Sequence, residues 1–335
     1  MMGSAIENFW SSIRAHALAL LVVVFSIAVS GGTVHAQTTS WPNKPIKLIV
    51  PYSAGGGTDN SARLLANHLA TALGQAIVIE NRPGGGSAVG ADALAKSSPD
   101  GYTLMLATSA TLTVGPLLSS KLPYKTSDIM PIAAFGTLPL YVMVSAADGP
   151  KTFAELIAKG KSKEISVGTA GNGTMGHMSA ELIALRSGLN LIVVPFKGLS
   201  AALPDVAAGR VDFAVADTNS AHGLIGAGKL RVLAATTAKR SALEPNIQSM
   251  VDVGVKDVDV SAWMVIAAPK ATPAPIVARL EAEILKIMGT PQVQQQFTAA
   301  GIEPYPLGTE ALNRMLAEEN TAWKQVVEKS GMKVE

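Results

Sequence analysis

The 335-residue chain contains no cysteine, and it has few charged and few aromatic residues. The absence of cysteine excludes disulfides, thiolate metal sites and a cysteine nucleophile. Charged residues make up 16% of the chain, below the roughly 25% of an average globular protein, and hydrophobic residues make up 48%. This composition fills a large core and excludes bulk disorder. The net charge is only +2, so the concentrated positive surface of a nucleic-acid-binding protein is not expected.

The first 36 residues have the pattern of a secretory signal peptide. Arg14 precedes an apolar run from 17 to 29, and small residues follow up to Ala36. The alternative, a membrane anchor, would need about 20 apolar residues, which is more than this run supplies. We therefore expect cleavage after about Ala36 and export of the mature protein. Because no cysteine stands at the cleavage point, a lipid anchor is excluded.

Short β-branched runs alternate with stretches of helical period in the rest of the chain. This alternation predicts an α/β fold with mostly parallel sheets and helices on both faces. The predicted strands are 46–50, 77–80, 102–108, 141–144, 165–168, 192–196, 211–216, 231–237 and 263–268. The predicted helices are 58–73, 87–96, 153–159, 175–186, 201–208, 220–227, 275–288, 291–300 and 310–328.

No linker rich in proline or serine divides the mature chain, although its length suggests two domains. One solution is a pair of α/β lobes between which the chain crosses on strands. The last third of the chain would then return to complete the first lobe. Such a protein has a cleft between its lobes and bends at the crossings.

A first glycine loop, residues 51–59, is the most informative segment. Its sequence, Pro-Tyr-Ser-Ala-Gly-Gly-Gly-Thr-Asp, follows a predicted strand and opens a predicted helix. Converging amides and a helix N-terminus form a candidate site for an anion, either phosphate or carboxylate. The Walker A and dinucleotide-binding spacings are both absent. The alternative is that the glycines only make a tight turn, with Thr58 or Asp59 capping the helix.

A second glycine loop, residues 168–174, has the same relation to the helix predicted from 175. Two such loops, one on each lobe, would face each other and hold both ends of a small anion. His177 lies in the first turn of this helix. It either contacts the ligand or, as is common for a lone histidine, is satisfied by hydrogen bonds.

Motifs for catalysis or metal binding are missing. The chain has neither the G-x-S-x-G nor the H-E-x-x-H pattern. His177 and Glu181 have i,i+4 spacing, but one such pair is weak evidence for a metal site. We therefore predict no enzyme, no catalytic residue, no metal and no cofactor, and keep an exported hydrolase of small esters or amides as the rival hypothesis.

An ordered series of motifs runs through the mature chain. It comprises WPxKPI at 41–46, the first glycine loop, ENRPG at 80–84, PDGYTL at 99–104, LPY at 122–124, AGNGT at 170–174, PFKG at 195–198, AGKLR at 227–231 and SAW at 261–263. In order and spacing this series resembles the Bug family of periplasmic solute receptors, the substrate-binding components of tripartite tricarboxylate transporters.

The resemblance implies a two-lobed Venus-flytrap fold of the class 2 periplasmic type, each lobe a mostly parallel or mixed sheet flanked by helices. The first lobe would comprise 37–141 and 262–335, and the second 142–261. A carboxylate would bind between them, held by backbone amides and water. The resemblance further implies a periplasmic location, a membrane permease as partner, no nucleic acid, and a monomer.

The resemblance also implies a set of ligand-binding residues, in which every member has a structural alternative. In the structural alternative, for example, Tyr52 and Phe196 only pack against the core, and the side chain of Lys197 is exposed to solvent. The implied residues are Tyr52, Ser53, Ala54, Gly55, Gly56, Gly57, Thr58, Asp59, Thr108, Ser109, Thr111, Ala170, Gly171, Asn172, Gly173, Thr174, His177, Phe196, Lys197, Gly198, Asp217, Thr218 and Asn219.

The segment 215–220 departs from the family pattern, which often has Phe-Asp-Asn followed by Leu-Pro. Here it is Val-Ala-Asp-Thr-Asn-Ser. Asp217 would either pair with the amino group of an amino-acid ligand or cap the helix that begins near Ser220. We favour the capping or lining role. An ionised Asp217 facing a second carboxylate would repel it.

The small side chains at 108–111 leave room for a flat or bulky acid. An aromatic carboxylate or a dicarboxylate such as terephthalate is therefore one hypothesis for the ligand, beside an aliphatic acid or an amino acid. A receptor that presents its closed form to a signalling protein is the alternative to transport. Both roles need the same closure, so the sequence does not separate them.

Overall fold

The structure is a computed structural model that describes residues 41–241 and 243–330. The predicted signal peptide, residues 1–36, lies outside the described residues. Among the residues that are described, no helix combines the length and the apolar character needed to cross a bilayer.

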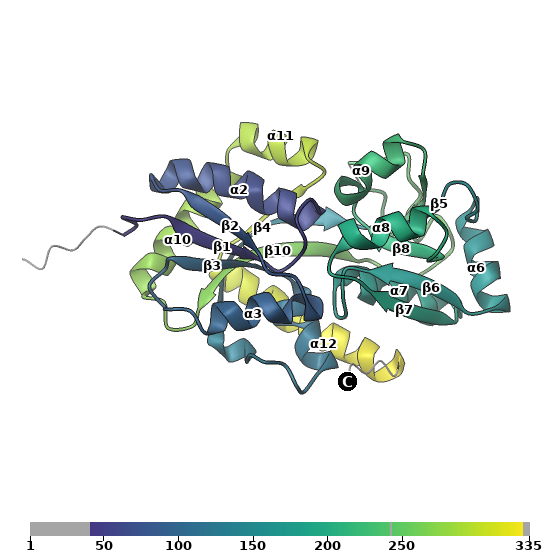
Figure 1. Ribbon diagram of the computed structural model, residues 1–335, viewed down its shortest axis with the longest axis horizontal. Helices are drawn as coiled ribbons and strands as arrows, with labels where there is room; N and C mark the ends of the chain where they lie inside the picture. The colour runs from purple at the N-terminus through teal and green to yellow at the C-terminus, as the bar shows by residue number, and fades with distance from the viewer. Residues whose placement is uncertain (1–40, 242, 331–335) are drawn as a thin grey trace, which may run out of the picture. The chain divides into compact units, whose positions relative to one another are not determined.

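Two β-sheets organise the described chain (Figure 1). The first has six strands in the order β11-β4-β10-β3-β1-β2, and the second has five in the order β7-β6-β8-β5-β9. The strands of the first sheet are β1 (Ile46–Val50), β2 (Ile77–Asn81), β3 (Thr103–Ala107), β4 (Ile129–Pro139), β10 (Ser261–Pro269) and β11 (Glu303–Leu307). Those of the second are β5 (Tyr141–Ser145), β6 (Ile165–Thr169), β7 (Leu191–Pro195), β8 (Phe213–Ala216) and β9 (Leu230–Ala235).

Helices cover both faces of each sheet, and most of them connect successive strands. They are α2 (Gly57–Leu73), α3 (Ala88–Ala95), α4 (Ser109–Leu112), α5 (Val114–Leu118), α6 (Phe153–Ser162), α7 (Met175–Ser187), α8 (Leu199–Ala207), α9 (Thr218–Gly226), α10 (Ala274–Met288), α11 (Pro291–Ala299) and α12 (Thr309–Ser330). Two short 3₁₀ helices, η1 (Gly85–Ser87) and η2 (Thr126–Asp128), complete the set. In Figure 1, α2 and α11 cover one face of the first sheet and α3 lies on the other.

Both sheets mix parallel and antiparallel strands, so the βα alternation alone overstated the parallel share. β1 runs parallel to β2 and β3, as expected for strands joined by helices. β10 is antiparallel to both β3 and β4. The reason is topological: β4 carries the chain toward the second sheet and β10 brings it back, so the two neighbours run in opposite directions.

Two crossings join the sheets. The chain leaves the first sheet at Pro139 and enters the second at Tyr141, and it returns at Ser261. The buried Thr236 ties the crossings together, because its Oγ1 donates to the carbonyls of both Leu140 (3.2 Å) and Val260 (2.6 Å). The lobes are therefore connected by two adjacent strands that share a hydrogen-bonding residue.

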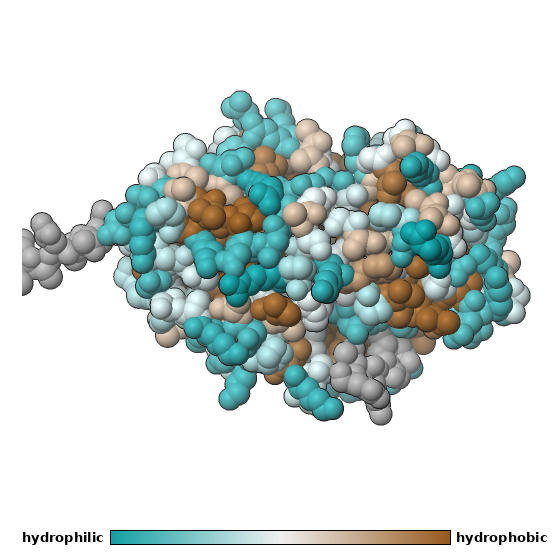
Figure 2. Space-filling view, viewed as in Figure 1, coloured by the Kyte–Doolittle hydropathy of each residue, from teal (hydrophilic) through white to brown (hydrophobic). Residues whose placement is uncertain are grey.

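Alternate side chains of the strands pack into different cores, so both faces of each sheet are buried. In β1, Leu48 packs with α2 and α10, while Ile49 packs with α3. In β5, Val142 packs with α6 and α7, while Met143 packs with α8. On the face of the molecule in Figure 2, hydrophilic residues cover much of the surface and the hydrophobic areas between them are small and separate.

Two strands were missed by the sequence analysis, and prolines explain both omissions. β4 contains Pro131 and Pro139, and β11 contains Pro304 and Pro306. Proline cannot donate to a sheet, so such segments are not expected to be strands. β11 tolerates its prolines at the edge of the sheet, and the pairing of β4 with β10 is irregular at two points.

Candidate functional site

A cavity of about 60 Å³ lies where the two lobes meet. The N-terminal ends of α2 and α7 and the loop before α8 contribute to its wall, and the crossing segments add apolar side chains. The lining residues are Tyr52, Ser53, Gly56, Gly57, Thr58, Thr108, Ser109, Leu138, Leu140, Ala170, Thr174, Met175, Gly176, Gly198, Leu199, Val215, Asp217, Ser220 and Ala262.

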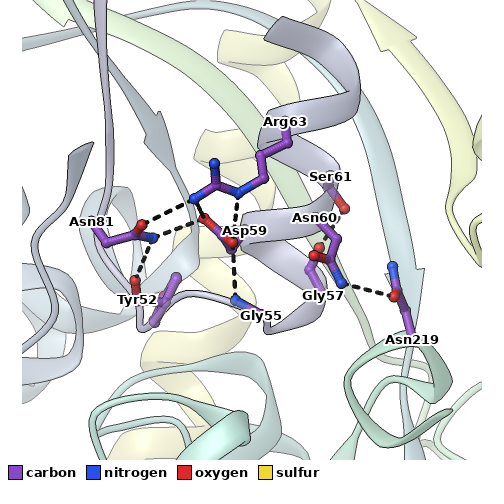
Figure 3. Close-up of polar contacts among 9 residues, drawn as sticks. All are labelled: Tyr52, Gly55, Gly57, Asp59, Asn60, Ser61, Arg63, Asn81 and Asn219. Atoms are coloured by element: carbon purple, nitrogen blue, oxygen red, sulfur yellow. Dashed lines mark hydrogen bonds and ion pairs between the residues drawn. The ribbon is translucent and has the colours of Figure 1, made fainter. Parts of the chain in front are cut away.

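Asp59 fixes the conformation of the first glycine loop through hydrogen bonds (Figure 3). Its carboxylate accepts hydrogen bonds from the amide of Gly55 (3.0 Å), from Arg63 (2.9 Å) and from Asn81 (2.8 Å). Asn81 also donates to the carbonyl of Tyr52 (3.0 Å). Burial alone would raise the pKa of Asp59, but the bonds from Arg63, Asn81 and Gly55 outweigh it and hold the pKa below its usual value. Asp59 therefore shapes the loop and does not line the cavity.

Two hydroxyl groups beside the first loop differ in their bonding. The phenol of Tyr52 is 2.8 Å from Oγ1 of Thr108, and burial raises its pKa to about 12, so it stays neutral. The Oγ of Ser109 is buried beside the cavity and has no hydrogen-bond partner among the described residues. Thr111 contacts Ser87 instead, 3.0 Å away, and lies outside the cavity. A buried hydroxyl without a partner needs one, which makes Ser109 a candidate ligand contact.

The second glycine loop is held by its own helix. The amide of Gly173 donates to Nδ1 of His177 (3.0 Å), and the hydroxyl of Thr174 donates to the carbonyl of Gly171 (2.8 Å). His177 is buried, and the hydrogen-bonded alternative describes it. Its Nε2 lies 3.6 Å from Oε1 of Glu181, so both ring nitrogens face groups of the same loop and helix. The loop consequently presents backbone and Thr174, rather than an imidazole, to the cavity.

Direct hydrogen bonds join the lobes around the cavity. The amide of Gly57 donates to Oγ of Ser220 (2.6 Å), and Nδ2 of Asn60 donates to Oδ1 of Asn219 (3.1 Å). The amide and the hydroxyl of Ser53 both donate to the carbonyl of Lys197, at 3.2 and 2.7 Å. The conformation is thus closed, and Lys197 takes part through its backbone while its side chain is exposed.

Asp217 is the N-cap of α9, the role favoured from the sequence. Its carboxylate accepts from the amide (2.6 Å) and from the hydroxyl (2.8 Å) of Ser220. The same carboxylate lines the cavity and is 3% exposed. Burial raises its pKa, although the bonds from Ser220 oppose the rise. Capping and lining are therefore compatible at this position.

The structure brings about half of the sequence-predicted residues to the cavity. The predicted residues that line it are Tyr52, Ser53, Gly56, Gly57, Thr58, Thr108, Ser109, Ala170, Thr174, Gly198 and Asp217. Those that it places elsewhere are Ala54, Gly55, Asp59, Thr111, Gly171, Asn172, Gly173, His177, Phe196, Lys197, Thr218 and Asn219. Most of the second group shape the loops or bridge the lobes.

Sequence reasoning missed eight lining residues. They are Leu138, Leu140, Met175, Gly176, Leu199, Val215, Ser220 and Ala262. Leu138, Leu140 and Ala262 lie at the crossings, and of these only Leu138 belongs to β4, the strand that the sequence analysis missed. Nothing in the sequence indicates that the hydroxyl of Ser220 meets the amide of Gly57, 163 positions away.

The chemistry of the cavity is that of binding. Neutral hydroxyls, helix N-termini and apolar side chains make up its wall, and Asp217 is the only acidic or basic side chain among the described lining residues. No group of three or more histidine, aspartate or glutamate side chains within residues 41–241 and 243–330 has the arrangement of a metal site. Helix N-termini of this kind favour the carboxylate or phosphate of a bound molecule.

Two lobes joined by crossing strands, with a cavity at their junction, define a two-lobed binding protein of the periplasmic-binding-protein class. Residues 61–332 match the Tripartite tricarboxylate transporter family receptor family, and the chain belongs to this family. The resemblance drawn from the motifs is thereby confirmed. The chain is 34% identical to Protein BugT of Bordetella pertussis over 319 residues, which covers 94% of this chain and 98% of that protein.

Solved structures agree with this assignment. The R. palustris protein Rpa4515 with adipate superposes with a TM-score of 0.84 at 29% identity, covering 88% of this chain and 99% of that one. The periplasmic binding protein BugD gives 0.82 at 29% identity, with 88% and 99% covered. MatC from Rhodopseudomonas palustris with bound malate gives 0.80 at 29% identity, with 86% and 100% covered. The family and these neighbours are solute-binding proteins and not enzymes.

Proposed function

We propose that this protein is a periplasmic receptor that captures a small carboxylate between its lobes and delivers it to the membrane permease of a tripartite tricarboxylate transporter. The observation that carries the proposal is the cavity wall, where the N-terminal ends of α2 and α7, on different lobes, both border the cavity together with Ser109, whose buried hydroxyl has no hydrogen-bond partner among the described residues. The adipate and malate bound by two structural neighbours support a carboxylate as the ligand class.

The proposed contacts are backbone amides and hydroxyls. The first-turn amides of a helix have no partner within the helix, which leaves those of Thr58 on α2 and Gly176 on α7 suited to an anion. Thr174 and Ser109 add side-chain hydroxyls. Hydrogen bonds to a charged group contribute about 1.5–3 kcal/mol each, so three or four of them offset desolvation and reach the ~8 kcal/mol of micromolar binding.

Ligand size follows from the cavity. Its volume of about 60 Å³ holds a few water molecules but is less than half of the roughly 150 Å³ that accommodates benzene. Any dicarboxylate therefore needs the lobes to stand farther apart than they do in this closed conformation. An aromatic acid such as terephthalate needs the largest separation, and we favour a short aliphatic acid over it.

Closure is the proposed mechanism, with no chemical step. The ligand binds one lobe in the open form, and the second lobe then closes over it. We propose lobe limits of 37–141 with 262–335, and of 142–261. These limits are supported by the membership of β1–β4, β10 and β11 in one sheet and of β5–β9 in the other. The permease would dock on the closed form of a monomeric receptor.

A thermal-shift screen tests this function. The panel comprises acetate, malate, adipate, citrate, terephthalate and glutamate, with glucose and putrescine as a neutral and a cationic control. A ligand at 100 times its Kd stabilises the folded protein by about 2.7 kcal/mol, which raises the melting temperature by a few degrees. We expect at least one carboxylate to do so. Stabilisation by glucose or putrescine alone would overturn the proposal.

A further inference from the structure

The carboxylate of Asp217 lies between the N-terminal ends of two helices, one from each lobe. On its own lobe it accepts from the amide and the hydroxyl of Ser220 in the first turn of α9. Gly57, the first residue of α2, faces it from the other lobe so closely that an added Cβ atom would overlap Oδ1 of Asp217. Both helix ends carry partial positive charge, so a single anion neutralises them together.

None of the described residues that line the cavity has a cationic side chain. The charged and titratable groups on the elements around the cavity are paired with other groups, neutral or exposed. They include Asp59 with Arg63 on α2, His177 with Glu181 on α7, Tyr141 on β5, Asp205 of α8 with Arg210, Arg231 on β9, which donates to the carbonyls of Ala146 and Pro150, and the exposed Lys197 and His222. The other titratable lining residue is Tyr52, a neutral phenol.

A ligand carboxylate in this cavity therefore meets a site that already contains an anion. Two carboxylates that share a buried site do not both stay ionised, because each disfavours the charged form of the other. A proton shared by the pair removes the repulsion and adds a hydrogen bond between them. The proton comes from hydronium or a buffer acid in the solvent, and it forms an O–H bond on one of the two carboxyl groups.

We propose that Asp217 is a built-in counter-anion of the cleft, and that a ligand carboxylate enters the site together with one proton, which the two carboxyl groups share. This inference rests on the proposed carboxylate-binding function and specifies how the site admits an acid. In the closed conformation without a ligand, Asp217 takes the place of the ligand's charge between the two helix ends.

The competing possibility is an ammonium group on the ligand that pairs with Asp217. The position of Asp217 argues against this pairing. A cation beside this carboxylate would also lie next to the N-terminal ends of α2 and α9, which carry partial positive charge. Each oxygen of Asp217 accepts one hydrogen bond from Ser220 and keeps a further lone pair, which is open to either partner. The two possibilities differ in the sign of the effect when Asp217 loses its charge.

The pH dependence has a definite sign. A second carboxylate raises the pKa of the pair, so binding takes up protons and the affinity falls as the pH rises. The fall approaches tenfold per pH unit between the pKa of the free receptor and that of the complex. Burial already raises the pKa of Asp217 in the free protein, which moves this window upward from the usual range of aspartate.

The test is calorimetric titration of the wild type, Asp217→Asn and Asp205→Asn with malate, adipate and glutamate at pH 5, 6.5 and 8. Asparagine and aspartate are equally good N-caps, so α9 keeps its cap. Asp217→Ser, which also caps, is the second variant in case the first folds poorly. Asp205 is the matched control, because it is an aspartate of the same lobe whose side chain pairs with Arg210 and lies outside the cavity.

We expect Asp217→Asn to bind malate or adipate at least tenfold more tightly than the wild type at pH 8, with little dependence on pH. The wild type should weaken as the pH rises and should show a binding heat that varies with the ionisation enthalpy of the buffer. Asp205→Asn should match the wild type within about twofold, as surface changes usually do.

Equal or weaker binding of malate and adipate by Asp217→Asn at pH 8, including no binding by either protein, would overturn the inference. Loss of glutamate binding by tenfold or more in this variant would do the same and would assign Asp217 to an ammonium group. The proposed function fails separately, if no carboxylate in the thermal-shift panel stabilises the wild type.

Discussion

The amide of Gly57 donates a 2.6 Å hydrogen bond to the hydroxyl of Ser220, which joins the first turn of α2 on one lobe to the first turn of α9 on the other. The Ser220 hydroxyl in turn donates to Asp217, so the bond across the cleft ends at a buried carboxylate. The closed conformation is therefore built on contacts between helix ends, where a ligand anion would also bind.

Gly57→Ala should hinder closure. The added Cβ would overlap Asp217 in the closed form, whereas alanine favours the α2 helix itself. We expect ligand affinity to fall by about tenfold or more, a cost of ~1.4 kcal/mol, with no loss of melting temperature in the absence of ligand. Titration calorimetry and circular dichroism measure the two quantities.

The matched control is Gly223→Ala, a helical glycine of α9 at which an added Cβ meets nothing within 4 Å. It should bind as the wild type does. Equal affinities for the wild type and both variants would show that the closed contact at Gly57 is not used in binding.

Ser53→Ala and Lys197→Ala should behave differently, although the two residues contact each other. Ser53 loses its side-chain bond to the carbonyl of Lys197, which is worth about 0.5–1.5 kcal/mol, or roughly a two- to tenfold loss of affinity through a weaker closed state. Lys197→Ala keeps that carbonyl and should change affinity by less than about twofold. A large loss of ligand affinity in Lys197→Ala would instead show that the lysine side chain contributes to the binding site.

His177→Ala should destabilise the fold, because it leaves the buried amide of Gly173 without its acceptor. An unsatisfied buried donor costs about 1–3 kcal/mol, measurable as a lower urea midpoint at an unchanged m-value. His222→Ala removes an exposed histidine of α9 and serves as the control, with an expected change within about 0.5 kcal/mol. Full stability of His177→Ala combined with lost ligand binding would instead make His177 a ligand contact.

Glu319 on α12 should make stability depend on pH. Its carboxylate accepts from Nε1 of Trp263 (2.7 Å) and from Thr113 (2.8 Å), and burial raises its pKa. A raised pKa in the folded state means that this group's contribution to stability is complete below its unfolded pKa, about 4.3, and is lost as the pH rises through the folded value.

Glu319→Gln removes this titration and keeps an oxygen for Trp263. From pH 4 to pH 7 the wild type should therefore lose stability relative to the variant, at no more than about 1.4 kcal/mol per pH unit. Urea denaturation at several pH values gives the difference, and Glu318→Gln at the exposed neighbouring position controls for the loss of charge. A difference that stays constant over this range would show that Glu319 does not titrate differently on folding.

The sequence was informative where its signals are local. The periodicity of the hydrophobic residues and the turn-forming residues located β1, the first glycine loop and α2 almost to the residue. The ordered motifs identified the family. The crossing of the chain between two sheets also followed, from the absence of a linker. β4 and β11 were not predicted because segments that contain prolines are typical of loops. Only the complete sheet shows why these prolines are tolerated: β11 lies at its edge, and the pairing of β4 with β10 is irregular.

The site was harder to predict because a glycine loop does not reveal which of its amides are free. The amides of Gly55 and Gly173 are taken by Asp59 and His177 within the same loops, and that of Gly57 by a serine from the other lobe. Local spacing permits the first two pairings, but the family resemblance also implies Asp59 and His177 as ligand contacts, and the sequence alone does not decide between the two roles. The third depends on how the lobes close, which no local pattern encodes.

Calorimetric titration of the wild-type protein with the carboxylates of the thermal-shift panel tests most directly whether the cleft captures an acid. We predict one binding site per molecule for at least one of them, a Kd of about micromolar, and a radius of gyration in X-ray scattering that decreases on binding. Absence of binding by every carboxylate, or binding without any change in the radius of gyration and with unchanged affinity in Gly57→Ala, would contradict capture between the lobes.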